Sequence, residues 1–83
     1  MSHEAATMSV RDDHGSFFLV VLVVSDQPPV ITSYVTHHGQ TVMDLDAAGQ
    51  DWVVRPGVGP FSQAEMKRLE AACEALATAF EMV

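Results

Sequence analysis

The most prominent pattern in the chain is an uninterrupted apolar run of eight residues, Phe17–Val24. β-Branched and aromatic residues, which favour strands, make up most of this run. A strand that is apolar at every position belongs in the middle of a sheet covered on both faces, or at an interface between chains. We therefore predict a central strand over Ser16–Ser25.

Shorter β-rich or alternating segments on either side of this run predict further strands. These segments are Thr7–Arg11, Val30–His37, Thr41–Asp46 and Trp52–Arg55. Turn residues separate them at intervals of roughly ten residues, a spacing typical of an antiparallel meander. We expect four to five strands, with the sheet over residues 16–55, whereas residues 1–6 are expected to be flexible.

The last part of the chain predicts a helix. Ser62 and Glu65 have the S-x-x-E spacing of a capping box, in which each residue satisfies a backbone N–H of the other. Gln63–Met82 contains no glycine or proline and is rich in good helix formers. At helical spacing its apolar side chains share one face, which is wide enough to lie across a sheet.

These elements define the fold class as α+β: an antiparallel β-meander of four to five strands packed on one C-terminal α-helix. The 83 residues form one small domain, 1–83, because the chain is too short for two. The side chains that we expect in the core are those of Leu19, Val21, Met43, Leu45, Trp52, Leu69, Leu76 and Phe80.

A single helix covers only one face of such a sheet. The central strand nevertheless carries a second apolar set, Phe18, Val20, Leu22 and Val24, on its other face. Exposed apolar surface of this extent marks a binding site. We expect a second copy of the chain to cover it in a homodimer, with a different partner protein as the alternative.

Charge narrows the range of partners. Four Lys and Arg residues against eleven Asp and Glu residues give a formal net charge of −7. Direct binding to nucleic acid needs clustered cations, so the composition argues against it. The longest apolar run is far shorter than the roughly 20 residues of a membrane-spanning helix, and no secretory signal is evident. We expect a cytoplasmic protein without contact to a membrane.

No combination of residues in the sequence indicates an enzyme or a cofactor. The four histidines include the adjacent pair His37 and His38. In a strand the two would point to opposite faces, and at a strand end they would be exposed turn residues, so no metal site is expected. Asp44–Gly49 opens like a calcium loop but lacks its later ligands. Cys73 lies in the apolar stripe of the helix, where a thiol is a small buried hydrophobe.

The remaining candidates for function are the carboxylates. Acidic side chains can compete for the basic groove of a nucleic-acid-binding protein, and in size and charge alone the chain is similar to small phage inhibitors such as anti-CRISPR proteins. The hypothesis is therefore a non-enzymatic interaction module, an inhibitor or adaptor, that binds a basic surface. Its expected contact residues are Asp44, Asp46, Asp51, Glu70 and Glu74, with Trp52 or Tyr34 as an aromatic anchor. The alternative is a dimeric structural or small-molecule-binding domain whose acidity serves only solubility.

Overall fold

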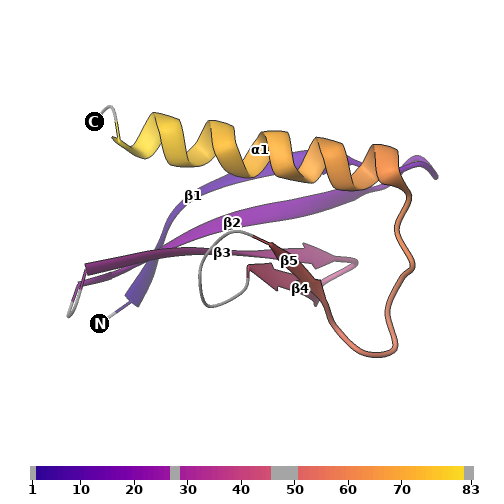
Figure 1. Cartoon of the computed structure of the whole chain (residues 1–83), viewed down its shortest axis with the longest axis horizontal. Coiled ribbons are helices and arrows are strands. Elements are labelled where there is room, and N and C mark those ends of the chain that lie inside the picture. The colour runs from indigo at the N-terminus through magenta and orange to yellow at the C-terminus, as the bar shows by residue number, and fades with distance from the viewer. Residues whose placement is uncertain (1, 27–28, 46–50, 82–83) are drawn as a thin grey trace.

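The structure, a computed structural model, describes residues 2–26, 29–45 and 51–81 (Figure 1). Five antiparallel strands follow each other in space in the order of the chain, and one helix follows them, which confirms the α+β meander. The elements are β1 (Ser2–Arg11), β2 (Phe17–Asp26), β3 (Pro29–His37), β4 (Gln40–Leu45), β5 (Trp52–Val54) and α1 (Gln63–Glu81).

The molecule has two layers, with α1 along one side of the twisted sheet (Figure 1). The helix contacts β1 and β2, whereas β4 and β5 lie farther from it. The long loop between β5 and α1 contributes Val58 and Phe61, which pack against the buried core formed by the sheet and α1. We call the sheet side toward α1 the helix face and the opposite side the open face.

β1 is longer than the sequence predicted. It begins at Ser2 and pairs with β2 along its length, with a register shift between Glu4 and Ala6. Residues 2–6, which we expected to be flexible, are part of this strand. The bulge explains why the sequence predicted this strand only from Thr7 onward, because one extra residue interrupts the alternation of polar and apolar positions.

The structure reverses the predicted orientation of β2. Phe18, Val20 and Leu22 are buried on the helix face, whereas Leu19 is on the open face and 38% exposed. Because both faces of β2 are apolar, its neighbours decide the orientation: Phe18 is paired with Val10, and Val20 with the fully buried Val35. Leu19 is paired with Ser9 and Thr36 on the polar side of the same strands.

The remaining core predictions had mixed outcomes. Met43, Leu69 and Leu76 are buried as expected, and Val21 is also buried although it lies on the open face. Leu45 and Trp52 are only half-buried, since they belong to the short pairing between β4 and β5 at the edge of the sheet. The side chain of Phe80 lies outside the described residues.

The start of α1 confirms the predicted capping box. The backbone N–H of Glu65 donates to Ser62 Oγ at 3.0 Å, and the backbone N–H of Ser62 donates to Glu65 Oε1 at 2.8 Å. Two donors that the helix leaves unsatisfied thus have partners. Among the described residues, no helix is long and apolar enough to span a membrane.

Candidate functional site

The structure does not bring the predicted contact residues together on one surface. Tyr34 and Asp44 are direct partners across β3 and β4 on the open face, whereas Glu70 and Glu74 are exposed on α1. Trp52 is half-buried and packs against the core on the helix face, on the other side of the sheet from Tyr34. Asp51 is exposed next to β5, and Asp46 lies outside the described residues.

The open face carries an apolar stripe between polar margins. Phe17 and Leu19 of β2 are 56% and 38% exposed, and Val53 at the far edge is 54% exposed. By strand register, the same face carries the polar side chains Glu4, Thr7, Ser9 and Arg11 from β1, and Thr32, Tyr34, Thr36 and Asp44 from β3 and β4. An apolar centre with a polar rim is the usual anatomy of a protein interface.

Tyr34 covers part of this face. Its hydroxyl donates to Glu4 Oε1 at 3.1 Å, and the two residues belong to strands on opposite sides of β2. The tyrosine side chain therefore reaches across β2, where its own partner Val21 is only 2% exposed. This bond explains why Val21 is buried on a face that α1 does not cover.

Titration of Tyr34 tests this contact directly, since it is the only tyrosine in the chain. Burial and then the bond to Glu4 raise its pKa above the ordinary 10.0. Because the folded pKa is raised, the neutral hydroxyl stabilises the fold fully below about pH 10, and this contribution is lost as the pH rises through the folded pKa. Tyrosinate absorbance should give a midpoint above 10.0, and in Glu4→Ala a midpoint closer to that value. An unchanged midpoint in Glu4→Ala would contradict the contact.

The charges of the open face are balanced. Arg55 donates to Asp44 through Nε at 2.9 Å and Nη2 at 3.3 Å, and this pairing raises the pKa of the guanidinium. Arg11 and Glu4 supply one further charge of each sign from β1. Among the described residues, the carboxylates in excess of the cations therefore lie outside the open face, in part on α1.

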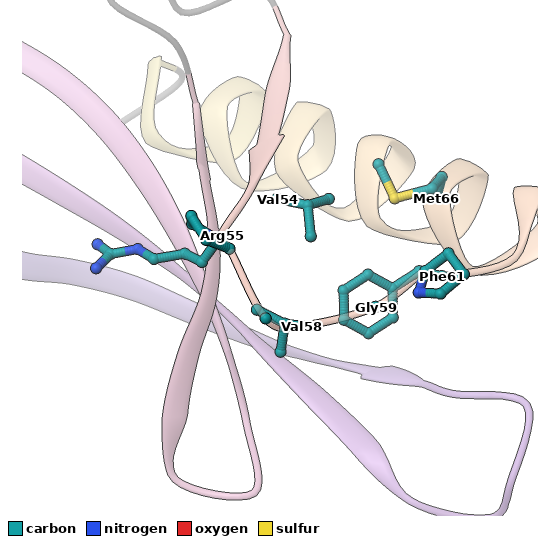
Figure 2. A pocket seen from close by; sticks show the side chains of 9 residues that line it. Val54, Arg55, Val58, Gly59, Phe61 and Met66 are labelled. Atoms are coloured by element: carbon teal, nitrogen blue, oxygen red, sulfur yellow. The ribbon is translucent and has the colours of Figure 1, made fainter.

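A shallow groove of about 570 Å³ lies between the β5–α1 loop and the first turns of α1. Figure 2 shows Val54, Phe61 and Met66 around it, whereas the charged end of Arg55 points away. The lining is apolar, so the groove offers no acid, base or nucleophile for a reaction.

A second group of polar residues gathers where β1 and β3 end. Asp12 is only 4% exposed, and its Oδ1 accepts hydrogen bonds from the backbone N–H groups of His14 at 2.8 Å and Ser16 at 2.7 Å. Its Oδ2 lies 2.9 Å from His37 Nε2. Desolvation alone raises the pKa of Asp12, but the bonds from His37, Ser16 and His14 outweigh it and lower the pKa from 3.8 to about 2.

His38 joins this group because of its backbone conformation. Only His37 belongs to β3; His38 has a φ of 54° and, with Gly39 at 77°, forms the tight turn into β4. The argument that adjacent histidines face opposite sides applies only within a strand, and here the two ring centroids are 4.1 Å apart. The strand argument therefore does not apply to this pair, and His38 is an exposed turn residue.

The turn after β1 is fixed to the start of α1. Asp13 accepts from the Ser62 hydroxyl and, at 2.7 Å, from Arg68 Nη2, and both bonds lower its pKa. The buried Glu65 accepts the backbone N–H of Asp13 at 3.0 Å, in addition to its capping bond. These contacts hold the segment that carries Asp12 in one place.

Asp12 is the functional candidate that sequence reasoning missed. A signal was available, since β1 and β3 run in the same direction in a meander and therefore end at the same edge of the sheet. The residues that follow or close these strands, Asp12 and His37, could have been placed together on that basis.

Comparisons of the chain with protein-family models, with curated proteins and with solved structures found no match.

Proposed function

We propose that this protein is a non-enzymatic protein–protein interaction module that acts as a homodimer and binds a partner with a basic surface. The observation that carries the proposal is the distribution of apolar surface and charge. The open face combines exposed Phe17 and Leu19 with balanced charges, whereas α1 presents Glu70 and Glu74 to solvent on the opposite layer.

The open face suits a second copy of the chain. Two molecules that each carry a net charge of −7 repel each other, so the surfaces that meet must be locally close to neutral. A two-fold axis over β2 would place Phe17 and Leu19 of both copies at the centre. The margins supply both an anionic Glu4 and a cationic Arg11, which can face their opposites in the other copy.

The helix suits a basic partner. Glu70 and Glu74 are one turn apart and exposed, and pairing through the open face leaves them on the outside of the dimer. Exposed carboxylates steer and orient a partner of opposite charge more than they add to affinity. The contact with such a partner should therefore depend strongly on salt.

Light scattering tests the dimer. The wild type should have twice the chain mass of 9.0 kDa at micromolar concentration, and Leu19→Lys should have the mass of a single chain while staying folded, because Leu19 is partly exposed. Glu70→Lys is the control on the other layer and should remain dimeric. A monomeric wild type would refute the dimer.

Affinity capture at graded salt tests the basic partner. Basic proteins retained at low salt should be released by several hundred millimolar salt, since exposed charges are screened within roughly 10 Å already at 0.1 M. Glu70→Gln/Glu74→Gln should lose the capture, whereas Asp44→Asn/Asp51→Asn, which removes as many carboxylates from the sheet side, should keep it. If both variants keep the capture, the helix carboxylates do not bind the partner; if the wild type retains no basic protein, the acidity serves only solubility and the dimer is a structural domain.

A further inference from the structure

We propose that Asp12, His37 and His38 form a binding site for a divalent transition metal ion, with zinc as the ion that fits best. The site is separate from the proposed protein interfaces: it lies where β1 and β3 end, and neither the dimer nor the helix contact uses these side chains.

The first argument is distance. One potential ligand atom from each of the three side chains lies within 4.8 Å of the other two, and Asp12 Oδ2 and His37 Nε2 are 2.9 Å apart. Zinc binds imidazole nitrogen and carboxylate oxygen at about 2.0–2.2 Å, so neighbouring ligand atoms of one ion lie about 3–3.5 Å apart. Small side-chain rotations therefore bring all three atoms to one ion.

The second argument is pre-organisation. Two backbone N–H groups hold Asp12 Oδ1, which leaves Oδ2 as the atom that turns toward the histidines. The ring of His37 packs against Phe18, with a centroid distance of 4.5 Å, and against Phe61 at 6.3 Å. Hydrogen bonds behind a ligand and packing around it fix its orientation, which is how metal sites support their ligands.

The third argument is the position of His38. A positive φ is uncommon for residues other than glycine, and histidine is among the side chains that adopt it most readily. The turn therefore accommodates His38 and brings a second imidazole next to His37 on the exposed side of the cluster. The backbone of the turn thus supports binding of one ion by both imidazoles.

The donor set indicates the kind of ion. Two imidazoles and one carboxylate suit zinc and similar transition metals, whereas calcium and magnesium prefer oxygen ligands throughout. Three protein ligands leave the fourth position of a tetrahedral zinc ion to water or to an external ligand. His37 binds through Nε2 when its single proton resides on Nδ1, so binding exchanges the hydrogen bond to Asp12 for a bond to the ion.

Calorimetric titration of the full chain with zinc tests the site. The wild type should bind one zinc ion per chain near neutral pH, and magnesium should not compete. Cobalt should bind with the visible absorption of a tetrahedral site. The ion should also raise the thermal unfolding midpoint, because it binds only the folded state.

The decisive variant is His38→Asn, which suits the positive φ of the turn and removes one ligand. It should weaken zinc binding by roughly tenfold or more, because replacing even a residue that only supports a ligand has an effect of this size. His14→Asn, an exposed histidine in the neighbouring turn, should bind as the wild type does. Equal binding by His38→Asn and the wild type, or no zinc binding by a folded wild type, would overturn the site, whatever the oligomeric state proves to be.

Discussion

Phe18→Ala is expected to lower the free energy of unfolding by about 3–5 kcal/mol, the usual loss when a buried phenylalanine is truncated. Phe18 is only 1% exposed and contacts the rings of His37 and Phe61. A chain of this length has a total stability of about 4–12 kcal/mol, so the loss is a large part of it. Urea denaturation followed by circular dichroism measures the effect.

The adjacent Phe17 is the matched control, since it is 56% exposed on the open face. Phe17→Ala should cost less than about 1 kcal/mol in a molecule that does not dimerise. Both substitutions are best made in the Leu19→Lys background, so that loss of the proposed dimer does not add to the result. Similar losses for the two phenylalanines would mean that the orientation of β2 is wrong.

Glu65→Ala is expected to lower the free energy of unfolding by about 2 kcal/mol. The buried carboxylate accepts two backbone N–H groups, those of Ser62 and Asp13, and its removal leaves both without this partner. The cost exceeds that of an ordinary capping residue because the second bond joins α1 to the turn after β1.

Glu70→Ala provides the comparison, since Glu70 lies on the same helix but is exposed. It should change the free energy of unfolding by less than about 0.5 kcal/mol. Chemical denaturation of both variants at one pH and salt concentration separates the role of the buried carboxylate from a general effect of charge. Equal effects of the two substitutions would contradict the capping role.

Local patterns predicted the elements of the fold well. Ser62 and Glu65 marked the start of α1 because a capping box depends only on neighbouring residues. The apolar run likewise predicted β2, because a run of strand-forming residues is also a local pattern. The orientation of β2 could not be read from its own residues, since both faces are apolar and the choice depends on Val10 and Val35 in other strands.

The candidate sites were harder to predict, because they depend on long-range placement. Glu70 and Asp44 looked alike in the sequence, yet they lie on different layers, and Asp44 is paired with Arg55. The sequence placed His37 at a strand end and His38 in the turn that follows, but it could not show that Asp12, 25 positions before His37, lies beside them. Two adjacent side chains point to opposite faces within a strand, but they can point to the same site where the strand ends in a turn.

The attachment of the first hairpin to α1 has a consequence for the order of folding. The bonds from Asp13 to Ser62 and Arg68 join residues 49 and 55 positions apart. Contacts of such separation form late, because the intervening chain must first be ordered. The β1–β2 hairpin can pair early, but its turn acquires its final form only after α1 has docked. The two ends of the chain therefore complete their folding in the same step, and a nascent chain that lacks α1 has a turn without its anchor.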